Sequence, residues 1–207
     1  QNKTLDKVEN NTRKIANFYG TAMDTNAIEL AKLTPLKAEL AMINGIKDIP
    51  GLLKVITYLH SVGISTAFDL GVYQDMKNSE VNALYLSQGG LGLPNRDYYF
   101  NKEAHTLKIV TDYKTKHLSR MLTYVNSSFT SGAAGVFSLE KALATKSRKL
   151  EDLRDPYANY NKMSIAQLNK LTPKINWNTV FTQLNIKTDS VIIGQPEFFT
   201  QLNKTLT

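Results

Sequence analysis

Residues 88–99 read QGGLGLPNRDYY, and this stretch separates two parts of the sequence that have different apolar patterns. Before it, apolar residues alternate with other residues at period two on both sides of a polar turn at residues 74–79, which predicts a β-hairpin over about residues 67–88. After it, apolar residues recur at helical spacing. Three glycines and a proline within residues 89–94 suit neither pattern, so we expect a loop there.

Two long helices are predicted after this loop, over about residues 102–125 and 133–151. The first has an apolar stripe that consists of Leu107, Val110, Leu118, Met121 and Val125. The second has a stripe that is predicted to face the core and consists of Val136, Leu139, Leu143 and Leu150. Both helices therefore contribute an amphipathic surface to the expected fold.

Shorter elements complete the pattern. Helices are predicted over residues 5–20, 165–171, 177–184 and 197–206. Another helix is predicted to begin after Asp24 or Thr25, either of which can cap it, and a further helix is predicted to begin at Pro50-Gly51. The apolar run at residues 191–193 predicts one strand or an extended buried segment. We therefore expect a mainly α fold that consists of a multi-helical lobe with a small β-hairpin at about residues 67–88. If residues 191–193 form a strand, the fold has one extra short strand.

Composition narrows the class of protein. A chain of 207 residues with 42% apolar and 21% charged residues can bury a sizeable core. The net charge of +7 suggests nucleic-acid binding, but the basic residues are spread along the chain without a dense run, so the charge favours solubility and a long-range field instead. The absence of cysteine excludes disulfides and thiolate metal sites and does not indicate a compartment.

Targeting and membrane signals are weak. No run of 18 apolar residues occurs, so no membrane span is predicted, and no signal peptide is recognisable. The first residue, Gln1, is not an initiator methionine. We therefore expect the chain to begin inside a longer product, after processing or by truncation.

The histidines do not form a metal-binding pattern. A zinc hydrolase of the His-Glu-x-x-His type needs two imidazoles one helical turn apart with a glutamate as general base, and this pattern is absent. His105 and His117 lie on one predicted helix, about 18 Å apart at about 1.5 Å per residue, which is too far to share a metal. His60 is expected at a helix end or at the margin of the core. We predict no catalytic residue, no cofactor-binding residue and no metal ligand in this chain.

Three other motifs have a functional and a structural interpretation. Gly90-Leu91-Gly92 lacks the third glycine and the Gly-Lys-Ser/Thr of a phosphate loop, so a flexible turn is favoured. The charged cluster at residues 151–155 could serve acid–base chemistry, but an ion-paired helix end compensated by Arg154 is favoured. The Arg96-Asp97-Tyr98-Tyr99 segment suits both fixing a loop and gripping a ligand, and the sequence leaves both open.

Several blocks, in order, resemble the neprilysin-type zinc metallopeptidase family and together span about residues 15–206. The blocks are Phe18-Tyr19-Gly20-Thr21-Ala22-Met23-Asp24-Thr25 with Ile28-Glu29, Asp75-Met76-Lys77-Asn78-Ser79, QGGLGLPNRDYY at 88–99, Leu139-Glu140 with Leu143-Ala144, Arg154-Asp155-Pro156, Tyr160-Asn161-Lys162-Met163-Ser164, and Gln195-Pro196 with Phe198. Ala22 stands where animal members have cysteine, so the resemblance implies a member without the corresponding disulfide, as expected for a bacterial homologue.

The resemblance implies that residues 1–207 are a single partial domain within the N-terminal helical lobe of a larger enzyme. The family's His-Glu-x-x-His and Glu-x-x-x-Asp helices, and its substrate-gripping arginine, have no counterpart here. The parent protein would be a zinc-dependent endopeptidase of oligopeptides, and this lobe would restrict access to the cavity that it shares with the catalytic lobe. The resemblance further implies that zinc binds to the parent protein and not to this segment, and that this segment has the catalytic lobe as its partner. It also implies that the parent lies outside the cytoplasm, in the periplasm or at the cell surface.

The alternative to part of a peptidase is that this chain is a helical protein-interaction module that has lost the peptidase domain. In either case, a partial lobe is expected to expose apolar faces, and these would allow the isolated chain to self-associate.

Overall fold

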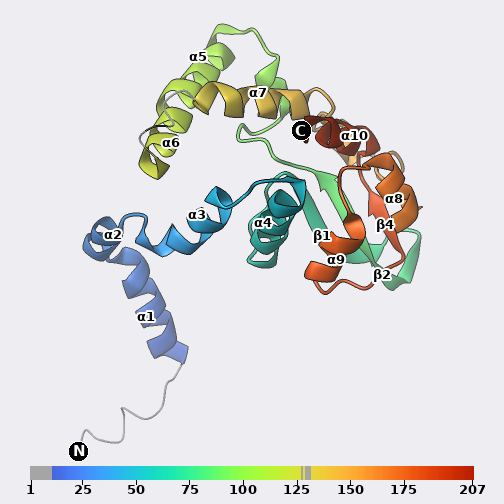
Figure 1. Ribbon diagram of the computed structural model, residues 1–207, viewed down its shortest axis with the longest axis horizontal. Coiled ribbons are helices and arrows are strands. Elements are labelled where there is room, and N and C mark those ends of the chain that lie inside the picture. Colours follow the sequence, from blue (N-terminus) through green and yellow to red (C-terminus); the bar gives the residue numbers. More distant parts are fainter. Residues whose placement is uncertain (1–10, 127, 129–131) are drawn as a thin grey trace, which may run out of the picture. The chain divides into compact units, whose positions relative to one another are not determined.

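The computed structural model describes residues 11–126, 128 and 132–207 (Figure 1). The chain divides into two compact units, Gln1–Asn44 and Gly45–Thr207. Helices predominate and a small sheet lies within the second unit, which confirms the expected mainly α fold.

The first unit consists of short helices in succession. They are α1 (Asn11–Met23), α2 (Thr25–Ala31), the 3₁₀ turn η2 (Thr34–Leu36) and α3 (Lys37–Asn44). Asp24 caps α2 by accepting a hydrogen bond from the Ala27 N–H at 2.9 Å. Asp24 was one of the two residues predicted as the cap of this helix. The first part of the predicted helix at residues 5–20 lies outside the described residues, and the described part continues to Met23.

The second unit begins with α4 (Ile49–Ser61), which Asp48 caps through the Gly51 N–H. Its later helices are η3 (Arg96–Tyr99), α5 (Ala104–Asp112), η4 (Tyr113–Leu118), α6 (Ser119–Val125), α7 (Gly132–Ala144), η5 (Asp152–Arg154), α8 (Ile165–Leu171), α9 (Trp177–Gln183) and α10 (Pro196–Thr205). Its strands are β1 (Phe68–Asp75), β2 (Asn78–Gln88), β3 (Asn161–Ser164) and β4 (Ser190–Ile193).

The four strands form one mixed sheet in the order β1-β2-β4-β3. The β1–β2 hairpin is antiparallel and confirms the prediction for residues 67–88. β4 pairs parallel to β2, with Tyr85 opposite Ile192, and this confirms the extra strand at residues 191–193. β3 completes the sheet antiparallel to β4 and was not predicted, because Asn161–Ser164 lacks an apolar alternation.

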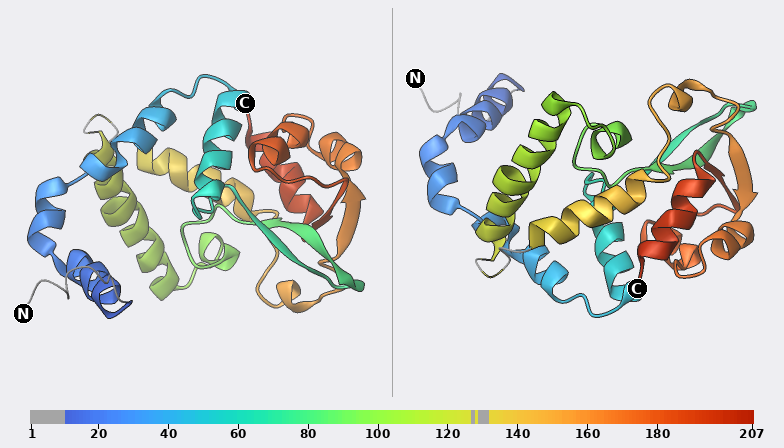
Figure 2. Two further views of the ribbon diagram at one scale, coloured as in Figure 1. Left: turned by 90° about the horizontal axis from the view of Figure 1, so that it is seen from below. Right: turned by 90° about the horizontal axis from the view of Figure 1, so that it is seen from above.

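The main core lies where α8, α9 and α10 gather beside β2 and β4 (Figures 1 and 2). Trp177, Phe198, Phe199 and Phe68 are fully buried in it. α8 begins with a capping box in which the Ser164 hydroxyl and the Gln167 side chain each accept a hydrogen bond from the other residue's backbone N–H. The core is thus built chiefly from the last third of the chain around one hairpin.

Two predictions for the long helices are wrong in part. The helix predicted over residues 133–151 ends at Ala144, and of its predicted stripe only Leu143 is buried, while Leu139 and Leu150 are half exposed. The helix predicted over residues 102–125 contains a π-helical segment, η4, between α5 and α6. Its Leu107, Met121 and Val125 are exposed, so its stripe does not face the core of this unit.

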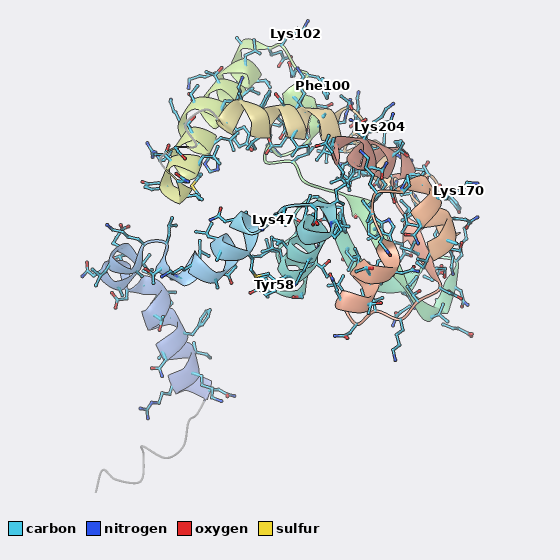
Figure 3. The ribbon with its side chains drawn as sticks, in the orientation of Figure 1. Lys47, Tyr58, Phe100, Lys102, Lys170 and Lys204 are labelled. Carbon is cyan, nitrogen blue, oxygen red and sulfur yellow. The ribbon has the colours of Figure 1, made fainter. Side chains whose placement is uncertain are left out.

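The positive charge is distributed over the second unit. The labelled Lys102 lies in the loop between η3 and α5, while Lys170 lies in α8 and Lys204 in α10 (Figure 3).

Candidate functional site

The glycine-rich stretch at residues 88–99 forms a loop that borders a cavity of about 500 Å³. A Cβ added at Gly89 would lie 3.0 Å from the Phe68 Cα, so the backbone would have to shift, and Gly90 adopts a positive φ of 71°. The favoured interpretation of Gly90-Leu91-Gly92 as a turn is therefore supported by its backbone. Asp69, Arg96, Glu140 and Arg148 also line the cavity, and these charged side chains make it the candidate site.

Glu140 of α7 is buried beside this cavity and accepts hydrogen bonds from two tyrosines. The Tyr99 hydroxyl donates to Oε2 at 2.9 Å and the Tyr113 hydroxyl donates to Oε1 at 2.7 Å. The Leu93 N–H in turn donates to the Tyr99 hydroxyl at 3.1 Å, so the loop is bound to the same network. The ring of Phe137 stacks on Tyr99 with centroids 5.4 Å apart. The network fastens the loop, η3, η4 and α7 together.

Burial, followed by the hydrogen bond to the Glu140 carboxylate, raises the pKa of Tyr99 and of Tyr113 well above the usual tyrosine range. Both hydroxyls therefore remain protonated donors at neutral pH. A carboxylate satisfied by two fixed donors positions a loop, and neither tyrosine is set up to act as a base.

We expect the Gly92→Ala substitution to disrupt this network. A Cβ at residue 92 would overlap the Tyr113 hydroxyl and lie 2.8 Å from the Glu140 Oε1, so a buried hydrogen bond must break or the loop must shift. Overpacking of this kind costs about 1–3 kcal/mol of unfolding free energy. Urea denaturation followed by circular dichroism measures the loss.

The matched control is Gly135→Ala in α7, where nothing lies within 4 Å of an added Cβ. This variant should be neutral or gain about 1 kcal/mol, because alanine favours a helix over glycine. Equal stability of the two variants would show that the approach of Tyr113 to Gly92 is not tight.

Arg96 fixes the far end of the loop. Its Nε donates to the Ala144 carbonyl oxygen at 3.2 Å, and its guanidinium lies 5.1 Å from the centroid of the Phe100 ring. Asn95 caps η3 by accepting from the Asp97 N–H at 2.9 Å. Of the two interpretations that the sequence left open for residues 96–99, these contacts support loop fixing.

Arg148, which also lines the cavity, connects its own segment to β2, to α10 and to the segment at Ala158. Its guanidinium donates to both carboxylate oxygens of Glu197, at 2.6 and 3.2 Å, and to the Ala158 carbonyl oxygen at 2.9 Å. Its backbone N–H and C=O bond to the side-chain amide of Gln88, at 2.6 and 3.1 Å. Gln195 extends the network by accepting from the Gln88 N–H at 2.8 Å. We name these residues the Arg148 hub.

The hairpin turn is anchored by Asp75, which is buried. Its carboxylate accepts from Lys162 Nζ at 2.8 Å, from the Lys77 N–H at 2.9 Å and from the Tyr160 hydroxyl at 2.9 Å. The hydrogen bond from Lys162, followed by that from the Lys77 N–H, lowers the pKa of Asp75 to about 2. The Asp75-Met76-Lys77-Asn78-Ser79 block is therefore a structural anchor between the hairpin and β3.

We expect Asp75 to stabilise the fold above the ordinary carboxyl pKa of 3.8 and to lose this contribution as the pH falls toward about 2. The sign follows because the folded pKa lies below the unfolded one, so acid protonates the unfolded chain first. In Asp75→Asn, the unfolding free energy should vary less with pH across this window. Urea titrations between pH 5 and pH 2.5 measure the slope.

Glu80→Gln, on the exposed part of the same hairpin, removes one carboxylate without these contacts and serves as the control. Its pH dependence should match that of the unsubstituted chain. A wild-type slope in Asp75→Asn would contradict the assignment.

The three histidines lie apart in the sequence and in different surroundings. His60 is near the end of α4, 4.9 Å from the Phe68 ring, and burial lowers its pKa. His105 is in α5, and His117 is in η4, where it stacks on Tyr113 at 5.8 Å. Among the described residues, no group of three or more His, Cys, Asp or Glu side chains could hold a metal ion. The described residues therefore do not fit a zinc ion.

The charged cluster at residues 151–155 is a 3₁₀ turn rather than the end of a long helix. Asp155 accepts hydrogen bonds from the backbone N–H groups of Tyr157 and Ala158. Within the part of the chain that the structure describes, Glu151 pairs with Lys149 at 3.8 Å and Arg154 has no salt bridge. The predicted helix end is therefore wrong, since the cluster is a 3₁₀ turn, and Arg154 is the basic residue in the last turn of η5.

None of the helices in residues 11–126 and 132–207 has the length and apolar character needed to cross a bilayer.

Comparison with known proteins gives consistent matches. The model of peptidase family M13 matches residues 1–207. Endothelin-converting enzyme 1 is 30% identical in Homo sapiens over 92% of this chain and 26% of the relative, and 29% identical in Bos taurus over 92% and 27%. Human neprilysin is 33% identical over 74% of this chain and 23% of its own length. The chain thus spans about a quarter of the curated relatives that it matches.

Solved structures show the same relationship. Mycobacterium tuberculosis zinc metalloprotease Zmp1 in complex with an inhibitor is 25% identical, with a TM-score of 0.81 over 88% of this chain and 28% of that chain. PepO from Lactobacillus rhamnosis, at 16% identity and a TM-score of 0.72, shares the fold over 86% of this chain and 29% of its own.

Proposed function

Since the chain belongs to peptidase family M13, as an N-terminal region of the neprilysin type, we propose that it is the non-catalytic helical lobe of a zinc-dependent metalloendopeptidase that cleaves small peptides. The match of the family model over residues 1–207 is the observation that carries this proposal. The described residues offer no metal-binding group, so the proposal assigns the zinc and the hydrolytic step to other parts of the parent.

We further propose that the lobe restricts access to the catalytic cavity of the parent. A wall that selects by size must not yield to a larger substrate, and closely packed, fully hydrogen-bonded interiors resist deformation. The Glu140 network and the Arg148 hub, which each include a residue that lines the cavity at residues 88–99, supply this kind of rigidity. The resemblance also supports an extracytoplasmic location of the parent.

We expect the full-length parent to cleave oligopeptides, and to lose all turnover with a zinc chelator and regain it when zinc is restored. The 207-residue chain alone should show neither turnover nor stoichiometric zinc binding at sub-micromolar affinity. Peptide cleavage followed by mass spectrometry, and calorimetric titration with zinc, measure these outcomes. When the same cleavage sequence is placed in a folded protein, we expect the parent not to cleave it.

A parent that remains active in the presence of chelator would contradict the peptidase assignment. Equal cleavage of the short peptide and the folded protein would contradict the access role alone. A coding sequence without a His-Glu-x-x-His after residue 207 would instead support the alternative of an interaction module.

A further inference from the structure

The cavity at residues 88–99 is lined by charged side chains of two kinds, and the first kind is already engaged by the fold. Glu140 accepts a hydrogen bond from a tyrosine at each of its carboxylate oxygens. Arg148 donates from all three guanidinium nitrogens to other parts of the second unit. Both side chains therefore hold the structure together.

The second kind consists of Asp69 and Arg96, which keep polar groups available at the cavity. Asp69 follows the core residue Phe68 on β1, so the alternation of the strand directs its carboxylate away from the core. Toward the described residues this carboxylate makes no hydrogen bond or salt bridge and acts on His60 through its charge alone. Arg96 donates from Nε to the Ala144 carbonyl oxygen, whereas its Nη2 has no hydrogen-bond partner in residues 11–126 and 132–207. One carboxylate and one edge of a guanidinium thus remain open at the same cavity.

A third lining group points to a ligand independently. The Thr66 hydroxyl oxygen is buried, and it has no hydrogen-bond partner in the part of the chain that the structure describes. Buried polar atoms are nearly always hydrogen-bonded, because leaving one unpaired costs free energy. A polar ligand inside the cavity removes this cost.

We propose that this cavity binds a small zwitterion with one free ammonium group and one free carboxylate, which is an amino acid or a dipeptide. Asp69 is the partner of the ammonium group, Arg96 is the partner of the carboxylate through Nη2, and the Thr66 hydroxyl supplies a further polar contact. The cavity volume of about 500 Å³ lies within the range of about 300–1,000 Å³ that is usual for small-molecule sites. A peptidase releases peptides with free termini, so the link between this ligand class and the parent's products rests on the proposed function.

Calorimetric titration of the 207-residue chain with dialanine tests the proposal, and three related probes separate the charges. N-acetyldialanine keeps only the carboxylate, dialanine amide keeps only the ammonium group, and alanine is the shorter zwitterion. At least one zwitterion should bind about tenfold or more tightly than either blocked dipeptide, because each blocked form loses a hydrogen bond between charged groups. Tighter binding of dialanine than of alanine assigns the site to dipeptides, and the reverse assigns it to amino acids. No saturable binding of either zwitterion, or equal binding of dialanine and its blocked forms, would overturn the proposal.

Substitutions locate the bound zwitterion. Asp69→Asn removes the partner of the ammonium group, so it should weaken the binding of dialanine about tenfold or more and leave that of N-acetyldialanine unchanged. Thr66→Val keeps the shape of the side chain without the hydroxyl and should also weaken dialanine. Glu80→Gln removes a carboxylate outside the cavity and is the control, which should bind dialanine as the unsubstituted chain does. An effect of Asp69→Asn no larger than that of Glu80→Gln would overturn the assignment.

The full-length parent should show the same binding, recognised by its sensitivity to Asp69→Asn. Loss of this component in the parent would overturn the proposal, because other polypeptide of the parent would then fill the cavity. The titration does not depend on peptide turnover. An inactive parent that binds dialanine in this way would count against the proposed function and leave this inference intact, whereas an active parent without this binding would overturn the inference alone.

Discussion

Replacing Trp177 with alanine should lower the free energy of unfolding by about 3–5 kcal/mol, the range for removing a large aromatic side chain from a core. Trp177 is fully buried, and its ring lies 5.3 Å from Phe68, 5.6 Å from Phe181 and 6.0 Å from Phe199. Its indole N–H donates to the buried Thr172 hydroxyl at 2.7 Å. Urea denaturation followed by far-ultraviolet circular dichroism measures the loss, since the variant has no tryptophan fluorescence.

Two controls define the origin of the effect. Trp177→Phe keeps an aromatic ring but removes the donor to Thr172, so we expect an intermediate loss of about 1–3 kcal/mol. Tyr157→Ala removes an aromatic ring that is 83% exposed and should change stability by less than about 0.5 kcal/mol. A Trp177→Ala variant as stable as Tyr157→Ala would show that α9 is not part of the core.

Local signals explain how much of the fold could be predicted. The hairpin, the loop at residues 88–99 and the helix over residues 165–171 all depend on neighbours in sequence, and each was found close to its predicted position. β3 was missed because its polar sequence becomes a strand only by pairing with β4, about 30 residues later in the chain. Such pairing overrides local propensity and leaves no local trace.

The end of α7 and the candidate site were missed for the same physical reason. The helical pattern continues past Ala144, but the backbone of Arg148 pairs with the Gln88 side chain, 60 residues away in sequence. Glu140 was seen only as part of a family block, and its two tyrosine partners come from η3 and η4. Gly92 was one available signal, because a glycine beside leucines in a loop can mark a close approach of another side chain.

Removing the Arg148 guanidinium should be the most damaging change to the polar part of the fold. Arg148→Met keeps most of the side-chain volume but removes the paired bonds to Glu197 and the bond to the Ala158 carbonyl oxygen. Each hydrogen bond to a charged group contributes about 1.5–3 kcal/mol, and Glu197 is partly exposed and can be rehydrated, so we expect a net loss of about 2–4 kcal/mol. Urea denaturation of the 207-residue chain measures it.

Lys149→Met is the matched control, since it removes the same charge from the adjacent residue. Lys149 is paired with Glu151 only at 3.8 Å on the surface, so its loss should cost less than about 1 kcal/mol. Arg148→Lys restores the charge without the planar fork and should recover only part of the stability. Full recovery by lysine would show that charge alone holds α10 to the segment after α7. Incomplete recovery would show that this junction depends on the directions in which the guanidinium donates, because one ammonium group cannot bind both Glu197 oxygens and the Ala158 carbonyl oxygen in the same geometry.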